Sequence, residues 1–207
     1  MKHLMTVLRL LFLSLFIFLM IKGKPMLWFG VYAFSLLMAL VFGRVYCGAI
    51  CPMNTLMIPI DWFSKKLNIQ KRKIPSWLQS GKFAIFALFG SIITLFLAQR
   101  VLQQRLPLLP AWIALAVIIT LFFPPVVFHN LICPFGVLQK QFGKRPRYST
   151  RIIKEKCIGC KLCEEVCPSN AIVVQEENKK AIVDTALCLQ CANCQQVCPK
   201  DAIHYMK

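Results

Sequence analysis

Eight of the eleven cysteines in this 207-residue chain fall into two copies of one spacing near the C-terminus. The first copy runs from Cys157 to Pro168, the second runs from Cys188 to Pro199, and both read C-x2-C-x2-C-x3-C-P. The copies lie 31 residues apart, and an Ala-Ile pair follows each proline at the same distance. This internal repeat has the spacing with which bacterial ferredoxins bind [4Fe–4S] cubanes.

The spacing also predicts which thiols share a cluster. Three thiolates on one short loop can wrap only one face of a cube, so the fourth must come from elsewhere. In two-cluster ferredoxins this fourth ligand, the Cys before Pro, binds the cluster of the other repeat. We therefore predict a first cubane held by Cys157, Cys160, Cys163 and Cys198. The second is predicted to be held by Cys188, Cys191, Cys194 and Cys167.

Two other uses of so many thiols fit the sequence less well. Zinc sites use four ligands in two C-x2-C pairs, and no such division accounts for all eight thiols. A disulfide framework needs an oxidising compartment, whereas the charge asymmetry of the chain predicts that these cysteines face the cytoplasm. A segment as small as residues 148–207 usually needs metal or cross-links for stability, so we expect it to be largely unfolded without clusters. Short strands are predicted at Arg151–Ile153, Ala171–Val174, Ala181–Asp184 and Ile203–Tyr205.

The composition changes sharply near residue 145. Residues 1–150 hold 17 of the 25 Lys and Arg residues and a single acid, Asp61. Four apolar stretches there approach the roughly 20 residues that cross a bilayer as a helix. They are Leu4–Ile21, Leu27–Phe42, Phe83–Ala98 and Leu106–Phe128. The predicted fold is thus an all-α four-helix transmembrane region, residues 1–145, followed by a small α+β two-cluster bacterial ferredoxin-like domain, residues 148–207.

The first stretch has a basic start but no small-x-small cleavage site, so we interpret it as a retained helix rather than a signal peptide. A helix lying on the membrane surface is the alternative. Trp28 and Trp112 fall at the outer ends of the second and fourth stretches, as expected for residues of an aromatic belt.

Charge asymmetry predicts the orientation. The loops after the first and third stretches hold four basic residues, and the opposite side holds thirteen. By the positive-inside rule the N-terminus and the ferredoxin domain face the cytoplasm, which makes the chain a multi-pass protein of the cytoplasmic (inner) membrane. The basic excess flanks apolar spans, so anionic lipid explains it better than nucleic acid, and no nucleic-acid partner is predicted. Residues 56–78, with Trp62, Trp77 and five basic residues, are predicted to lie on the inner leaflet or to dock the ferredoxin domain.

Three cysteines remain outside the repeat. Cys47 and Cys51 precede Pro52 after the second stretch, and Cys133 precedes Pro134 after the fourth, with His129 in the place that corresponds to Cys47. The membrane part therefore also looks duplicated. If the two hairpins pack side by side, these residues converge at a candidate third site for a metal or an Fe–S centre, with the ligands Cys47, Cys51, Cys133 and His129. Ordinary burial of the cysteines, with His129 among headgroups, is the alternative.

The stretch from Gly43 to Pro52 after one helix, the later run from Cys133 to Gly136 after another, and the C-terminal double-cubane run together resemble the membrane-bound polyferredoxins. That family includes the membrane ferredoxin-type subunits accompanying periplasmic nitrate reductase and the C-terminal part of the nitrous-oxide reductase regulator/maturation protein. Its members usually carry C-x3-C-P in both membrane motifs, whereas His129 replaces the first Cys here. The resemblance implies electron transfer between a membrane quinol pool or soluble donor and a redox partner protein.

The sequence favours a membrane-anchored relay of single electrons at the cytoplasmic face. It contains no nucleophile or acid/base constellation and no nucleotide-binding loop, so a non-catalytic electron-transfer subunit of an oxidoreductase system is favoured over an enzyme. Quinone is a candidate partner beside redox proteins. The alternative function is a redox sensor or metalloenzyme maturation factor that uses the membrane thiols with electrons from the clusters.

Overall fold

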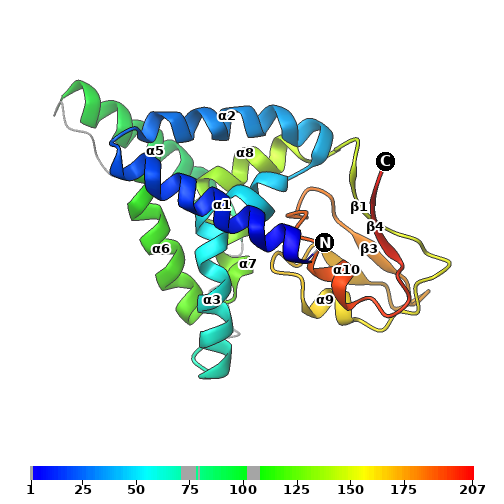
Figure 1. Cartoon of the computed structure of the whole chain (residues 1–207). Helices are drawn as coiled ribbons and strands as arrows, with labels where there is room; N and C mark the ends of the chain where they lie inside the picture. The colour runs from blue at the N-terminus through cyan, green and yellow to red at the C-terminus, as the bar shows by residue number, and fades with distance from the viewer. Residues whose placement is uncertain (1, 71–77, 79, 102–107) are drawn as a thin grey trace. The chain divides into compact units, whose positions relative to one another are not determined.

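The computed structural model describes residues 2–70, 78, 80–101 and 108–207 (Figure 1). The described chain forms two compact units. One comprises Met1–Thr55 and Gln139–Lys207, and the other comprises Leu56–Leu138. Five residues used in the sequence predictions lie outside the described ranges: Lys71, Arg72, Lys73, Trp77 and Arg105.

The first unit begins with a hairpin of two helices, α1 (Lys2–Ile21) and α2 (Pro25–Phe42). Pro25 begins α2, because proline at a first helical position loses no intrahelical hydrogen bond. The buried residues of α2 lie three or four apart and so form one stripe along the helix: Trp28, Tyr32, Ser35 and Ala39. The other faces of both helices expose large apolar side chains such as Leu10 and Phe34, as lipid-facing residues do.

Trp28 departs from the belt prediction. Its side chain is buried, its ring meets Phe16 edge to face at 5.0 Å, and its indole N–H donates to the Tyr46 hydroxyl at 3.1 Å. Trp28 is thus a core residue of this unit. Its ring packs against Phe16, and its one polar atom, the indole nitrogen, has a buried hydrogen-bond partner.

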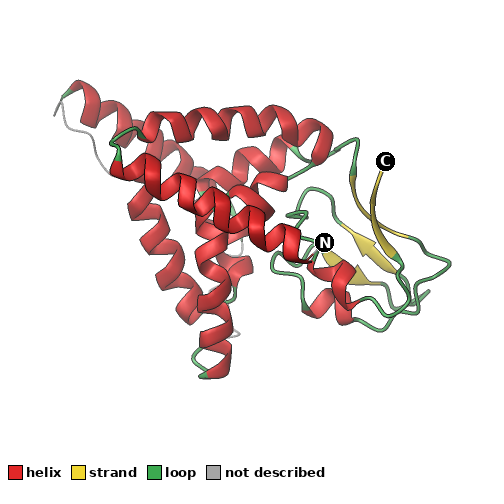
Figure 2. Cartoon of the chain, in the orientation of Figure 1, coloured by secondary structure: helices red, strands yellow, loops and turns green. Residues whose placement is uncertain are grey.

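All the strands of the described chain lie within residues 148–207 of the first unit, which we call the ferredoxin part (Figure 2). β1 (Ser149–Ile152) pairs antiparallel with β4 (Ile203–Met206), with Ile152 opposite Ile203. β2 (Ile172–Val174) pairs antiparallel with β3 (Ala181–Val183). Two short helices, α9 (Leu162–Glu165) and α10 (Asn193–Val197), contain the third cysteine of each repeat. All four strand predictions are confirmed to within one or two residues.

The second unit contains most of α3 (Pro52–Lys66), α5 (Lys82–Arg100), α6 (Leu108–Phe122), α7 (Pro125–Val127) and the start of α8 (Pro134–Phe142). Within the described residues, three helical segments are long and apolar enough to cross a membrane: Leu4–Ile21, Pro25–Phe42 and Lys82–Arg100. The fourth predicted span is shorter than expected, because α6 ends at Phe122 and Pro124 interrupts the helix. The count of four spans therefore stays a prediction.

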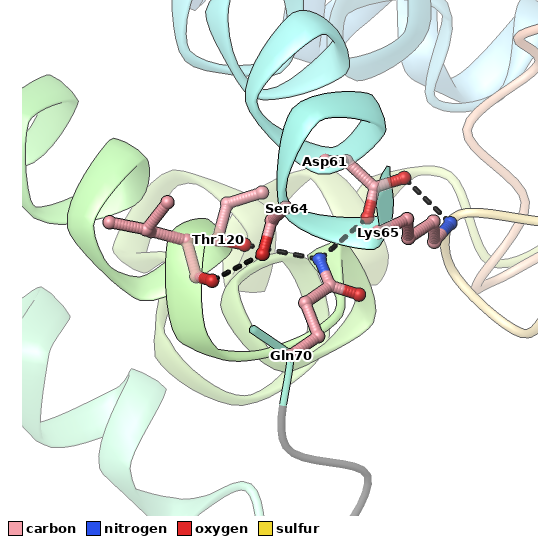
Figure 3. A network of polar contacts seen from close by, with 6 residues as sticks. Asp61, Ser64, Lys65, Gln70 and Thr120 are labelled. Carbon is pink, nitrogen blue, oxygen red and sulfur yellow. Dashed lines mark hydrogen bonds and ion pairs between the residues drawn. The ribbon is translucent and has the colours of Figure 1, made fainter. Parts of the chain in front are cut away.

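Asp61, the one acid of the membrane part, lies in a polar network inside the second unit (Figure 3). Its carboxylate accepts hydrogen bonds from Lys65 Nζ at 2.7 Å and from Gln70 Nε2 at 2.8 Å. Gln70 also donates to the Thr120 carbonyl at 3.1 Å, and the Ser64 hydroxyl donates to the Leu121 carbonyl. These contacts tie α3 to the end of α6 and pair the carboxylate with a cation, as a charge in an apolar setting requires.

Candidate iron–sulfur sites

The first cysteine loop surrounds a pocket at the surface of the ferredoxin part. The lining contains all four predicted ligands of the first cubane together with apolar side chains, including Ile152, Val174 and Ile203. Three of these cysteines come from the first repeat and Cys198 comes from the second, which is the arrangement that the predicted exchange of fourth ligands requires. Cys160 is exposed, whereas Cys163 is buried. The residues present therefore fit a cubane that is reachable from solvent.

The thiols predicted to hold the second cubane are more deeply buried. Burial raises the pKa of Cys188 to about 12, and the nearby thiols of Cys191 and Cys167 add to the rise. Burial likewise raises the pKa of Cys194, which also lies close to Cys191, Cys188 and Cys167. Cys167 of the first repeat thus lies near the three thiols of the second, as the predicted ligand exchange requires, and Cys163 also lies near Cys194. Such buried thiols stay protonated unless iron takes the place of the proton, which suits a cluster site.

Backbone geometry repeats along with the cysteines. Three pairs of residues 31 positions apart have positive φ: Gly159 (71°) and Gln190 (56°), Lys161 (65°) and Ala192 (61°), and Asn170 (49°) and Asp201 (44°). The amides of Ala171 and Ala202 donate to the sulfurs of Cys167 and Cys198 at 3.2 and 3.3 Å. Hydrogen bonds to cluster sulfurs are among the factors that set reduction potential. The duplication seen in the sequence is therefore present in the fold.

The second loop packs against the segment that follows α2. That segment, η1 (Tyr46–Ile50), is a π-helical turn closed by the Cys51 amide donating to the Tyr46 carbonyl at 2.8 Å. A Cβ on Gly48 would lie 2.1 Å from the Leu189 carbonyl oxygen, so only glycine allows this approach. Gln190 accepts hydrogen bonds from the Thr150 amide (3.0 Å) and hydroxyl (2.7 Å). We call this contact between η1 and Leu187–Cys191 the docking contact.

Two arginines border the docking contact. Arg44 is buried, with Nη1 donating to the Ala186 and Leu187 carbonyls at 3.3 and 3.4 Å and Nη2 lying 3.8 Å from the Cys47 sulfur. Arg9 of α1 donates through Nε to the Gly48 carbonyl at 2.8 Å. Burial raises the pKa of Cys191, while a backbone hydrogen bond at Asn193 and the positive charge of Arg9 act in the opposite direction.

The two membrane motifs have the same local structure. η2 (Phe128–Ile132) is a second π-helical turn, closed by the Cys133 amide donating to the Phe128 carbonyl at 2.8 Å. Cys51 and Cys133 end these turns with φ of −65° and −64°, and the proline after each begins the next helix. Such π turns in helical segments are often found at functional sites.

The residues of the predicted third site are buried and divided between the units. Cys47 and Cys51 belong to the first unit, and His129 and Cys133 belong to the second. Among the described residues, no three His, Cys, Asp or Glu side chains converge on a point where one metal ion would bind. A cubane does not require its ligands to meet at one point, because each of its irons binds a separate thiolate. The third site stays a prediction.

Comparisons with known proteins agree with these repeats. The 4Fe-4S dicluster domain family matches residues 156–202, and the 4Fe-4S binding domain family matches twice, at residues 24–70 and 106–151. The double match confirms the predicted duplication of the membrane part. No solved structure matches the chain at a significant level.

Several curated proteins are similar over about two thirds of the chain. An uncharacterised protein of Methanocaldococcus jannaschii is 27% identical, with 69% of this chain and 58% of that protein covered. The methylamine utilization ferredoxin-type protein MauN of Paracoccus denitrificans is 27% identical (70% and 55% covered). The ferredoxin-type protein NapH of Haemophilus influenzae is 26% identical (65% and 51% covered). The chain thus spans little more than half the length of these relatives.

Repeated ferredoxin loops joined to apolar helices of membrane length define the class of membrane-associated iron–sulfur proteins. Within that class, the chain belongs to the membrane-bound polyferredoxins, as its motifs predicted. The likeness to the nitrous-oxide reductase regulator stays a prediction.

Gly48, Gln190 and the two arginines were not predicted as site residues. A signal for the arginines was present, because Arg9 is the one charge inside the first apolar stretch and Arg44 lies two residues after the second. Charges in such places usually face a functional site. No local pattern marks Gln190, since its role depends on a strand 40 residues away.

Proposed function

We propose that this protein relays single electrons at the cytoplasmic face of the inner membrane, between a donor and a redox partner protein. The donor is a quinol pool or a soluble reductant. The observation that carries the proposal is a contrast between two groups of cysteines. One group lines a surface pocket, and the other includes buried Cys188 and Cys194 beside a membrane motif. Such a pair offers an entry and an exit for electrons within one unit.

The residues that hold the clusters are proposed as the sequence predicted them: Cys157, Cys160, Cys163 and Cys198 for the first, and Cys188, Cys191, Cys194 and Cys167 for the second. When bound, each cubane supplies a reversible one-electron couple. The protein provides apolar walls, amide donors to the Cys167 and Cys198 sulfurs, and the anchor to the membrane part. Exposed Ile158 and Leu162 beside Cys160 give a redox partner an apolar surface to approach.

Cys47, Cys51, Cys133 and His129 are proposed as a third centre, which holds an Fe–S cluster or a metal ion. Burial of all three thiols favours a held group over thiols that act on a passing metal or partner, and therefore favours the relay over the maturation function. The matching π turns support a shared role for the two motifs.

The test is the iron and acid-labile sulfide content of full-length protein purified anaerobically in detergent, with low-temperature EPR after reduction. Two cubanes give about eight irons per chain, and a clearly larger number supports a third centre. An iron-free protein would contradict the proposal.

Ligand substitutions test the assignment. Cys160→Ser should remove or alter the signal of the first cubane and Cys191→Ser that of the second, whereas the matched Cys51→Ser should spare both. Unaltered cubane spectra in the Cys160 variant would show that the ligand set is wrong. Protease digestion of the C-terminal part in inside-out and right-side-out vesicles tests the orientation, and cleavage only in right-side-out vesicles would refute it.

A further inference from the structure

Among the residues that the structure describes, the buried cation Arg44 has no carboxylate partner. The residue is 1% exposed, and its Nε has no hydrogen-bond acceptor within the described part of the chain. Among the described residues, the ion pairs join Lys65 to Asp61 and His204 to Asp201, and neither involves Arg44. Its other guanidinium nitrogens donate to the Ala186 and Leu187 carbonyls and to the Cys47 sulfur.

This arrangement calls for an anion. A guanidinium is always charged in proteins, and burying one without a counter-charge costs several kcal/mol, about as much as breaking a buried ion pair. Carbonyl oxygens offset part of that cost but carry no net charge. The carbonyls that Arg44 contacts belong to the residues just before Cys188, a proposed ligand of the second cubane. A cubane held by four thiolates has a net negative charge and is the anion expected there.

Arg9 brings a second positive charge to the same loop from a different element. It lies on the apolar helix α1 and is half-buried, with its Nε fixed to the Gly48 carbonyl at 2.8 Å. Gly48 itself lies against the second loop, because a Cβ added to it would lie 3.2 Å from the amide nitrogen of Cys191, another proposed ligand of the second cubane. Two cations from α1 and from the end of α2 therefore face one cysteine loop.

The first site has no comparable pair among the described residues. Lys161 and Lys200 line its pocket but are exposed, so water and salt screen their charges. Lys180 donates to the Cys157 carbonyl at 2.6 Å and is only half-buried. The cations at the first site are two exposed lysines and one half-buried lysine, whereas the second site has the half-buried Arg9 and Arg44, which is 1% exposed.

We propose that Arg9 and Arg44 are the counter-cations of the second cubane and raise its reduction potential, so that this buried site accepts electrons from the exposed first site. The inference rests on the proposed function, since it requires both clusters. Burial alone disfavours the added negative charge of reduction, and a fixed positive charge in a medium of low dielectric offsets that penalty. Transfer of one electron oxidises the first site and reduces the second by the same electron, with no bond made or broken.

The experiment is an EPR-monitored redox titration of the full-length protein in detergent. Arg9→Gln and Arg44→Gln should each lower the midpoint of one reduction step by about 59 mV, which corresponds to a tenfold change for a one-electron couple. Cys160→Ser identifies the step of the first cubane, because it changes a ligand of that cluster alone. Arg44→Lys keeps the positive charge, so its midpoint should lie much closer to that of the unaltered protein than the midpoint of Arg44→Gln does. Arg147→Gln removes an exposed charge from the same unit and should shift neither step.

The possible results distinguish a failure of this inference from a failure of the proposed function. Absence of both cubane signals in the unaltered protein would overturn the proposed function itself. Two intact signals with unshifted midpoints in Arg9→Gln and Arg44→Gln would overturn only the role of the arginines, as would a shift confined to the first cubane. If Arg44→Gln fails to fold, Arg9→Gln still decides the question, because Arg9 is only half-buried.

Discussion

The two cysteine loops share one spacing and one backbone but lie in opposite surroundings. The first opens to the surface at Cys160, and the second lies under η1 with Cys188 and Cys194 buried. Residues between the cysteines make the difference: Gly159 in the first loop corresponds to Gln190 in the second. The cysteines define the ligand geometry, and the intervening residues decide whether a loop faces solvent or the membrane part.

Gln190 shows what this difference costs. Both positions have positive φ, which glycine adopts freely but which costs other residues about 1–2 kcal/mol. Gln190 offsets that cost by accepting two hydrogen bonds from Thr150 of β1. Backbone strain that is retained in this way commonly marks a functional constraint. Here the constraint is the docking contact, which brings the second loop to Gly48.

Removing iron should have the largest effect and should abolish the difference between the loops. The core of the ferredoxin part contains the cysteines themselves, including Cys163 and Cys194 packed with Ile172 and Ile203. Without clusters this small core is too weak to hold the fold. We expect anaerobic chelation to make residues 148–207 susceptible to trypsin, beginning at exposed Lys161, while α1 and α2 stay protected in detergent. A tail that resists trypsin without iron would contradict this account.

Much of this fold could be predicted because its signals are local. The spacing of Cys157 to Cys167 identifies a cluster loop by itself, and the alternation around Ile172 and Ala181 identifies a hairpin. The end of α6 was less predictable. Hydrophobicity continues through Phe128, whereas the helix ends at Phe122 because Pro124 cannot donate a hydrogen bond.

Gly48→Ala should have the next largest effect, and on the second loop only. The added Cβ would meet the Leu189 carbonyl at 2.1 Å, and backbone cannot move aside as a flexible side chain can. We expect a destabilisation of about 3 kcal/mol, the upper end for overpacking. It should appear as faster amide exchange at Leu187–Cys191 and faster loss of the second cubane signal in air.

Gly30→Ala is the matched control for this variant. Gly30 lies within α2, and a Cβ added there would meet no neighbouring atom within 4 Å, so the same substitution places a methyl group in open space. It should leave both cubane signals and the exchange of the second loop unchanged. Equal effects of Gly48→Ala and Gly30→Ala would show that the docking contact is absent in solution.

The docking contact itself could not be predicted, because its partners are distant in sequence. Arg44 and Leu187 are 143 residues apart, and nothing in either segment specifies the other. The buried ends of Trp28 and Tyr46 likewise depend on each other. A charge in an apolar stretch indicates that a site exists but does not identify the group it faces.

Gln190→Gly tests whether strain or hydrogen bonding dominates at the position that distinguishes the loops. Glycine would relieve about 1–2 kcal/mol of left-handed strain. It would also leave the buried amide and hydroxyl of Thr150 without their acceptor, at about 1–3 kcal/mol each. We expect a net loss of about 2–3 kcal/mol in the free energy of unfolding, measured from thermal loss of cluster absorbance. Increased stability would mean that the second loop gains nothing from its glutamine.

Tyr205→Phe should have the smallest effect. The Tyr205 hydroxyl donates to the Phe42 carbonyl at the end of α2, at 3.0 Å, and the side chain is 40% exposed. An exposed hydrogen bond of this kind contributes about 0.5 kcal/mol, at the low end of the usual range. Tyr148→Phe is the control, because the Tyr148 ring stacks on Phe42 and the substitution keeps that ring.

The pH dependence of this last effect follows from the titration of the hydroxyl. Burial raises the pKa of Tyr205 to about 12, above the ordinary value of 10.0. Because the folded-state pKa is the higher one, the contribution of the protonated hydroxyl is complete below about pH 10 and is lost as the pH rises through about 12. The difference in melting temperature between Tyr205→Phe and the unaltered protein should therefore stay constant from about pH 7 to about pH 10. A difference that disappears within this range would mean that the hydroxyl titrates as it does in water and is not held against α2.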